Sequence, residues 1–230
     1  MPGMDDAADS RPQPPPAPGE GERPSALEAL GGPLGIGESV VPPIAFVTAY
    51  TISGEAATSA WIAVAMGAVL ALARIVRGQT PQYALAGLLG VGLAAFIVSR
   101  TGRAEDFFVP GLLANAGYAL GCLVSIVVRY PAVGLAVGSL RGEGTGWRSD
   151  VGRLRAYSRA TWIWVGIFSL RLAVQLPLYL AGAVVALGTA RVAMGIPVFA
   201  IGLWLTWLVL RVYEPDLLRG RGGAGGRGSS

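Results

Sequence analysis

The 230-residue sequence has no histidine, no lysine and a single cysteine, Cys122. One thiol cannot form a disulfide within the chain, so a disulfide-stapled fold is excluded. Without imidazole and with one thiolate, the common structural and catalytic zinc sites are excluded too, and we expect neither a metal ion nor a cofactor. Imidazole is also the most frequent general acid or base in enzymes, so its absence argues against a catalytic function.

Charged residues are also scarce. They make up 14% of the chain against 53% hydrophobic residues, and the mean hydropathy is +0.54. In soluble domains roughly a quarter of the residues carry charge. The composition therefore excludes a soluble domain, a fibrous protein and a disordered chain, and it predicts a multi-pass protein of the cell membrane. All 18 basic residues are arginine, which stays charged when buried and pairs well with phosphate.

The two ends of the chain differ from its middle. Residues 1–38 contain eight prolines, seven acidic residues and two arginines, which is typical of a disordered tail that could bind a protein partner. Within this tail, Ser25 and Glu28 have capping-box spacing and predict a short helix near residues 25–30, which the glycines and proline at 31–33 end. Residues 213–230 are rich in glycine and arginine and predict a flexible C-terminal tail.

The segment 39–212 consists of apolar runs separated by short arginine-bearing breaks. A helix needs about 20 residues to cross the hydrocarbon of a bilayer, so we predict an all-α, polytopic transmembrane helix bundle with about six spans. The first run begins with Pro42 and Pro43, which suit a first helical turn, and it is either a short span or a re-entrant half-helix. The predicted spans are residues 39–53, 56–73, 83–99, 107–128, 160–185 and 192–210.

The distribution of arginine predicts the orientation of these spans. The breaks after the second and fourth spans contain eight arginines, whereas the breaks on the opposite side contain three, Arg100, Arg103 and Arg191. Arginine concentrates in cytoplasmic loops, so the N- and C-termini are both predicted to be cytoplasmic. Residues 132–140 are too few to cross the bilayer and are expected to lie in its interface.

The long loop 141–159 contains a second predicted interfacial element. Ser149 or Asp150 is placed to cap a helix that continues into the fifth span. Leu154 and Trp162 would form its apolar side, and the arginines of the loop would face anionic lipid head groups. A lipid surface explains these arginines without nucleic acid as a partner.

Arg171 stands near the middle of the run 160–185, and Gln175 follows one helical turn later on the same face. A charged side chain at this depth costs ~2.5–3.5 kcal/mol on insertion scales, so it requires a partner or a wet cavity. Two interpretations remain open. Arg171 either forms a site for an anion or a carbonyl group, or is tied structurally to carbonyls at a span end or to a carboxylate.

A polar stripe on the fourth span is a second candidate. It contains Asn115, Tyr118, Cys122 and Ser125 at helical spacing, with Gly111 one turn before Asn115. The stripe either makes hydrogen bonds between helices or lines a common cavity with Arg171. On the second interpretation, the intramembrane polar site consists of Arg171, Gln175, Asn115 and Tyr118.

Glu105 and Asp106 lie just before the fourth span. Carboxylates suit the beginning of a helix, and either residue is a candidate counter-ion for Arg171. The alternative is a solvated turn in which they neutralise the neighbouring arginines.

Several long strings of residues carry a family resemblance, together with isolated positions such as Gly111, Asn115 and Arg171. The strings are residues 30–33, 38–39, 100–107, 142–148 and 174–177. On these residues the chain resembles an uncharacterised integral membrane family of actinobacteria, catalogued as domain of unknown function 3159. The resemblance implies a membrane protein and adds no mechanism. A smaller set, Pro43, Phe46, Tyr50 and Gly54, is similar to intracellular septation protein A, an inner-membrane protein linked to division.

These observations lead to two main hypotheses of function. The first is a non-enzymatic membrane scaffold or interaction protein that uses its acidic tail. The alternative is a small permease or channel-like transporter subunit with a polar site around Arg171, Gln175 and Asn115. A membrane enzyme that acts on lipid is a third hypothesis. It ranks below the other two, because its carboxylates would have to act without imidazole, thiol or metal.

Overall fold

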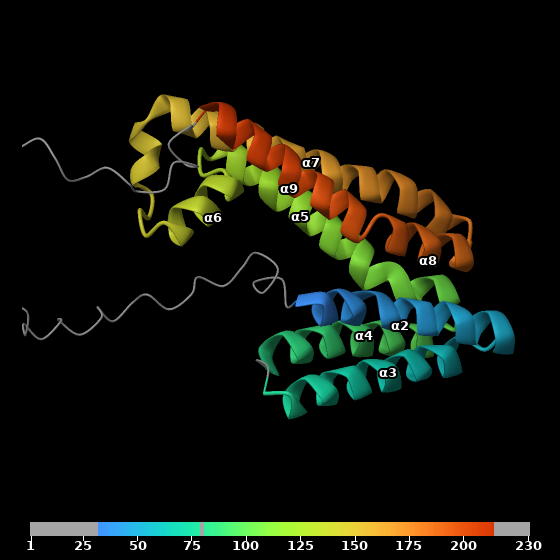
Figure 1. Cartoon of the computed structure of the whole chain (residues 1–230). Helices are drawn as coiled ribbons and strands as arrows, with labels where there is room; N and C mark the ends of the chain where they lie inside the picture. The colour runs from blue at the N-terminus through green and yellow to red at the C-terminus, as the bar shows by residue number, and fades with distance from the viewer. Residues whose placement is uncertain (1–31, 79–80, 214–230) are drawn as a thin grey trace, which may run out of the picture. The chain divides into compact units, whose positions relative to one another are not determined.

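The computed structural model describes residues 32–78 and 81–213. Within these residues all regular structure is helical and no strand occurs, which confirms the predicted all-α class (Figure 1). The helices are α2 (Gly32–Ser53), α3 (Ala56–Val76), α4 (Pro81–Thr101), η1 (Ala104–Phe108), α5 (Val109–Val127), α6 (Ala132–Leu140), η2 (Gly146–Ser149), α7 (Val151–Leu180), α8 (Val184–Ala193) and α9 (Ile196–Tyr213).

The chain divides into two compact units, Met1–Ile36 and Gly37–Ser230. The first unit contributes only the beginning of α2 to the described residues, and the second contains all the other helices. The short helix predicted near residues 25–30 lies outside the described residues. So does the predicted C-terminal tail, apart from Tyr213 at the end of α9.

Helix α2 begins earlier than the sequence suggested. Gly32 and Pro33 are the first two residues of this helix, where proline is tolerated because it lacks only a donor that would be unpaired there anyway. Pro42 and Pro43 consequently lie inside α2, so their predicted place in its first turn is wrong. The helix has 22 residues and a length of about 33 Å, close to the thickness of the hydrocarbon.

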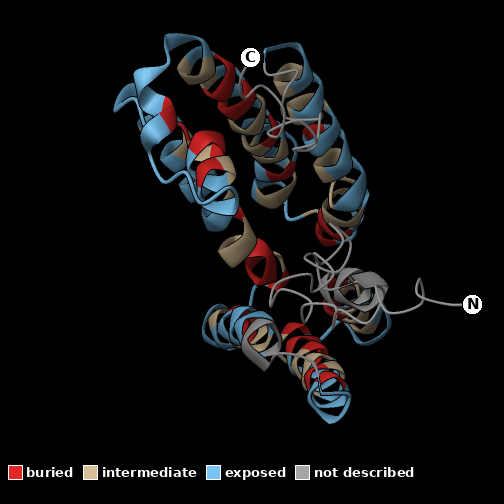
Figure 2. Cartoon of the chain, turned by 60° about the vertical axis from the view of Figure 1, so that its left-hand side comes forward, coloured by how far each residue is buried: buried red, intermediate tan, exposed pale blue. Residues whose placement is uncertain are grey.

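Four helical stretches among the described residues are long and apolar enough to cross a membrane. They are Ala56–Val76, Ala104–Val127, Val151–Leu180 and Val184–Tyr213, and shorter apolar helices cover Val40–Ser53 and Leu85–Thr101. Large apolar side chains cover the surfaces of these helices: Leu89 is 74% exposed and Leu113 is 66% exposed. Exposed residues dominate the helix surfaces in Figure 2. Such surfaces require lipid as their solvent, which makes the chain a membrane protein.

Helix α7 is the central element of the second half of the chain. It packs against both α5 and α9, while α3 packs against α4 (Figure 1). Asp150 caps α7 by accepting hydrogen bonds from the backbone N–H groups of Gly152 and Arg153, at 2.7 and 3.2 Å, as predicted. The capped helix and the fifth span are one continuous helix of 30 residues, which passes through Pro177 and ends at Leu180 rather than at residue 185.

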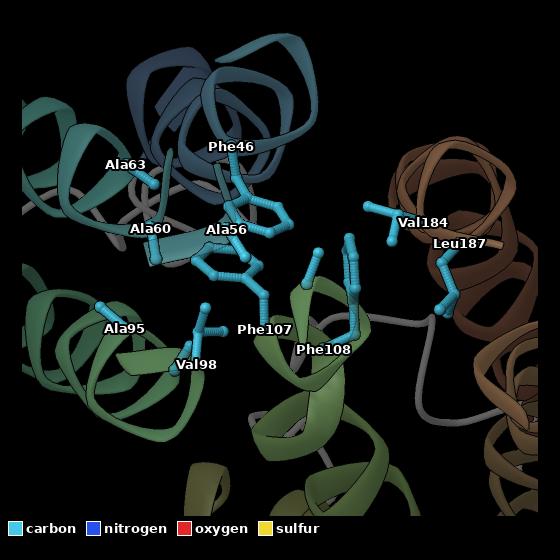
Figure 3. Packing of buried hydrophobic residues seen from close by; sticks show 12 residues of the cluster. Phe46, Ala56, Ala60, Ala63, Ala95, Val98, Phe107, Phe108, Val184 and Leu187 are labelled. Carbon is cyan, nitrogen blue, oxygen red and sulfur yellow. The ribbon is translucent and has the colours of Figure 1, made fainter. Parts of the chain in front are cut away.

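An aromatic core joins α2, η1 and α8. The rings of Phe46 and Phe107 stack with centroids 4.0 Å apart, and Phe108 meets Phe107 edge-on at 5.6 Å. Val184 and Leu187 of α8 lie on the far side of Phe108 (Figure 3). Since these residues lie near the end of α2, in the α4–α5 connection and at the start of α8, the aromatic core brings three turns of the chain to one end of the bundle.

A second cluster forms at the opposite end of α7. Trp147 and Tyr157 pack edge-on there with centroids 5.1 Å apart, over Gly134 and Gly138 of α6. A Cβ atom at Gly138 would lie only 2.6 Å from Nε1 of Trp147, so α6 needs glycine at this contact. The buried side of α7 carries Tyr157, and Leu154 packs against this cluster. Trp162, the other residue of the predicted apolar side, is 51% exposed.

Candidate functional site

Arg171 binds the break between α8 and α9. Its Nη2 atom donates hydrogen bonds to the carbonyl oxygens of Met194 and Gly195, at 2.5 and 2.7 Å. Met194 is the C-cap of α8, where a helix leaves its acceptors unpaired and where a positive charge is favourable. The Gly195 carbonyl also accepts a hydrogen bond from the backbone N–H of Phe199, at 3.3 Å. This arrangement matches the interpretation of Arg171 as a residue tied to carbonyls at a span end.

A second arginine, Arg191, enters the same region from α8. It was predicted to lie in a loop, but α8 continues through Ala193, so that assignment is wrong. The guanidinium of Arg191 lies directly on Gly111 of α5: an added Cβ would collide with Nη1 and approach Cζ to 2.8 Å. Its Cζ atom is also 6.0 Å from the centroid of the Phe108 ring. Gly111 therefore provides the space that Arg191 occupies.

The two arginines form what we call the dicationic centre, Arg171 and Arg191. The positive charge of Arg171 acts electrostatically on Arg191. Within residues 32–78 and 81–213, all ion pairs of the structure involve other arginines, so neither member of the centre has a carboxylate partner there. Two desolvated like charges without a counter-ion are costly, and the centre consequently attracts anions.

Gln175 lies one turn beyond Arg171 on the same helix face. Its side chain is buried, with 2% of its surface exposed, and its Oε1 atom has no hydrogen-bond partner. The Nε atom of Arg171 is also buried and also lacks a partner. Unpaired buried polar atoms are rare in proteins and often mark a place where a water molecule or a ligand binds.

Asn115 and Tyr118 have different environments, although both belong to the predicted stripe. Asn115 donates through Nδ2 to the carbonyl of Gly111 at 2.8 Å, one turn from the residue on which Arg191 lies. Tyr118 is 60% exposed and packs against Phe168, with centroids 5.3 Å apart. The structure thus brings Asn115 towards the dicationic centre but records no contact between Tyr118 and either arginine.

The predicted counter-ions pair with other groups. Arg103 donates through Nε to Glu105 at 2.8 Å, and this hydrogen bond and the charge of Glu105 raise the pKa of the Arg103 guanidinium. Asp106 is buried and accepts a hydrogen bond from the hydroxyl of Tyr179 at 2.7 Å. Glu105 therefore stabilises the α4–α5 turn from within, and Asp106 joins this turn to the end of α7. The structure records no ion pair between either carboxylate and Arg171.

Replacing Tyr179 with phenylalanine tests the importance of this connection. The change leaves the buried carboxylate of Asp106 without its donor, which we expect to lower the free energy of unfolding by about 1–3 kcal/mol. The measurement is the melting temperature of the purified protein in detergent. Tyr118→Phe is the matched control, because that hydroxyl is exposed and makes no hydrogen bond in the structure. Equal melting temperatures for the two variants would contradict the expectation.

The centre offers binding groups but no catalytic set. Within the described parts of the chain, no three histidine, cysteine, aspartate or glutamate residues gather in a way that could hold a metal ion. Arg171, Arg191, Gln175 and Asn115 supply positive charge and hydrogen bonds, and none of them is a nucleophile or a general base at neutral pH. This chemistry suits reversible binding of an anion.

The helices and this polar centre define a multi-pass helical membrane protein. The chain belongs to the family described as "Protein of unknown function (DUF3159)", whose model matches residues 30–216. No curated protein matches the sequence, and no solved structure matches the fold. The similarity to intracellular septation protein A stays a prediction.

Sequence reasoning found Arg171 and Gln175 but missed Arg191. Its interpretation as a loop residue came from Gly188 and from the short apolar run before it. The useful signal was the apolar character of Val184–Tyr213, a stretch of 30 residues that is long and apolar enough to cross a membrane. Arg191 lies within α8, and the break in the stretch comes only after it, at Met194 and Gly195.

Proposed function

We propose that this protein is a small, non-enzymatic permease of the cell membrane that binds an anion at the dicationic centre. The single observation that carries the proposal is the pair Arg171 and Arg191, inside apolar helices and without a carboxylate partner in the described residues. Intramembrane charges usually mark the path of a substrate or an ion. A purely structural role explains the bonds of Arg171 to carbonyls but leaves Arg191 without a function.

The proposal includes six spans and cytoplasmic termini. Helices α2 and α4 have 22 and 21 residues, which is sufficient to cross, and the last span consists of α8 and α9 together. The aromatic core gathers the α2–α3, α4–α5 and α7–α8 turns, as an up-and-down path with six spans requires. With Arg191 inside a span, the loops on that side contain only Arg100 and Arg103, which strengthens the arginine asymmetry.

We propose two partners at the cytoplasmic end: anionic lipid head groups, and a protein that binds residues 1–38. Arg155 and Arg159 at the beginning of α7 are exposed and can reach anionic lipid head groups. Arg148 is already engaged, because it donates to the Tyr130 hydroxyl at 2.6 Å and covers that ring. The scaffold hypothesis rests on residues 1–38 and stays a prediction; comparing membrane pull-downs with and without this segment tests it.

Uptake of radiolabelled anions into proteoliposomes tests the permease function. Liposomes that contain the full chain should accumulate at least one anion of a broad panel faster than protein-free liposomes. Arg191→Met should reduce this uptake to the background, because it removes one of the two charges of the centre. Arg155→Met is the matched control, since it removes an exposed arginine of α7 outside the centre. Background uptake of every anion by the unaltered protein would refute the permease.

A further inference from the structure

Two unpaired buried atoms of opposite hydrogen-bonding character lie at the dicationic centre, one on Arg171 and one on the neighbouring Gln175. Nε of Arg171 is a donor, Oε1 of Gln175 is an acceptor, and neither has a partner. Nη2 of Arg171 is fixed by the carbonyls of Met194 and Gly195, so the guanidinium cannot turn freely to satisfy its own Nε atom. An unpaired buried polar group destabilises the protein, and a ligand that pairs both atoms would recover this free energy.

Only some anions can pair both atoms. Chloride, and sulfate at neutral pH, can accept hydrogen bonds but cannot donate one. With the Gln175 amide in the orientation of the structure, they would satisfy the arginines and leave Oε1 facing another acceptor. An oxyanion that keeps a proton has acceptor oxygens together with one O–H donor. Phosphate and bicarbonate belong to this class near neutral pH, and their oxygens suit the planar guanidinium groups.

We infer, building on the proposed permease function, that the dicationic centre selects an oxyanion that keeps a proton, such as inorganic phosphate or bicarbonate. The anion accepts hydrogen bonds from Nε of Arg171 and from Arg191, whose side chain is only partly buried, and it donates its O–H to Oε1 of Gln175. Gly111 provides the space on the α5 side that the Arg191 guanidinium occupies.

A lipid with a phosphate monoester head group has the same chemistry, and the depth of the site distinguishes it from a soluble anion. Arg171 lies nine residues before the end of α7 at Leu180, a distance of about 14 Å along the helix. Half of the hydrocarbon is about 15 Å thick, so the Cα atom of Arg171 lies near the middle of the bilayer in the proposed topology, whereas Arg191 contacts Gly111 and Phe108 near the beginning of α5. The depth of Arg171 favours a soluble anion.

Equilibrium binding of radiolabelled inorganic phosphate tests the inference. The full chain is reconstituted in nanodiscs of phosphatidylcholine, and unlabelled phosphate, bicarbonate, sulfate and chloride compete for the site. We expect bicarbonate to displace the label and sulfate to bind at least about tenfold more weakly than phosphate, the effect of one lost hydrogen bond to a buried acceptor. Equal competition by sulfate and phosphate overturns the inference while the permease function stands, and the absence of binding by every anion overturns both.

The variant Gln175→Met tests the role of the acceptor. It removes Oε1 and keeps a side chain of similar length, so the preference for phosphate over sulfate should fall to within about twofold. Leu176→Met introduces the same side chain at the next, exposed position and should keep the full preference. A preserved preference in folded Gln175→Met, judged by its elution volume and tryptophan fluorescence, would overturn the assignment of Gln175.

Nanodiscs with phosphatidic acid distinguish the two sources of the anion. Unchanged binding of inorganic phosphate in these discs supports the soluble anion. Control discs contain phosphatidylglycerol in place of phosphatidic acid, at the same net surface charge. Loss of phosphate binding only in the discs with phosphatidic acid overturns the soluble source and assigns the site to the monoester head group.

Discussion

Replacing Arg191 with methionine is expected to raise the melting temperature of the anion-free protein and at the same time to abolish anion uptake. Arg191 has no carboxylate or hydrogen-bond partner among the described residues, so only its contact with the Phe108 ring offsets the cost of its partial desolvation. Replacing buried charges by apolar side chains of similar size often stabilises a protein by about 1–4 kcal/mol. Methionine is flexible enough to pack on Gly111 and Phe108 in the space that the arginine leaves.

Tryptophan fluorescence during heating, in detergent without phosphate or bicarbonate, measures the melting temperature, and the proteoliposome assay measures uptake. Arg155→Met serves as the control, with both quantities expected to stay unchanged. A decrease of the melting temperature in Arg191→Met would show that Arg191 stabilises the fold, which contradicts a residue kept for binding at the expense of stability.

The same replacement at Arg171 is expected to have the opposite effect on stability. Arg171 donates to two carbonyls at the α8–α9 break, and hydrogen bonds to charged groups contribute about 1.5–3 kcal/mol each. Arg171→Met should therefore lower the free energy of unfolding by about 3 kcal/mol or more. Lipid cannot replace the lost donors, so the break itself should become less well defined.

Arg171→Lys helps to separate charge from geometry. A lysine keeps the positive charge, but it lacks the planar fork that holds two carbonyls and presents a third donor. We expect its melting temperature to lie between those of the unaltered protein and of Arg171→Met. An unchanged melting temperature in Arg171→Met would mean that the two carbonyl bonds contribute nothing to the fold.

The sequence predicted the all-α class and the apolar character of the helices, but it placed several helix ends wrongly. Pro42 and Pro43 were interpreted as a first helical turn, and the fifth span was expected to end at residue 185. Both prolines instead lie inside α2, and α7 ends at Leu180. Proline and glycine interrupt helices in water because water competes for the exposed backbone. In an apolar environment that competition is absent, and the helix continues.

The polar site was predictable where the signal was local and unpredictable where it depended on tertiary packing. A charge in the middle of an apolar run identified Arg171, and helical spacing identified Gln175. The hydrogen bond between Tyr179 and Asp106 joins residues 73 positions apart, and no spacing rule connects them. The contact of Arg191 with Gly111 has the same character, because it requires α5 and α8 to approach each other.

The membrane topology is the basis of all these proposals, and labelling of introduced cysteines tests it most directly. Cys122 is the only native cysteine, so Cys122→Ala provides a background without thiols. Single cysteines at Gly54, Thr101 and Ala181 test the three turns at the aromatic core, and cysteines at Arg77 and Glu143 test the opposite end. A membrane-impermeant maleimide added to intact cells should label the first three and should reach the last two only after permeabilisation. Labelling of cysteines from both ends in intact cells, or of only part of the first three, would contradict six spans with cytoplasmic termini.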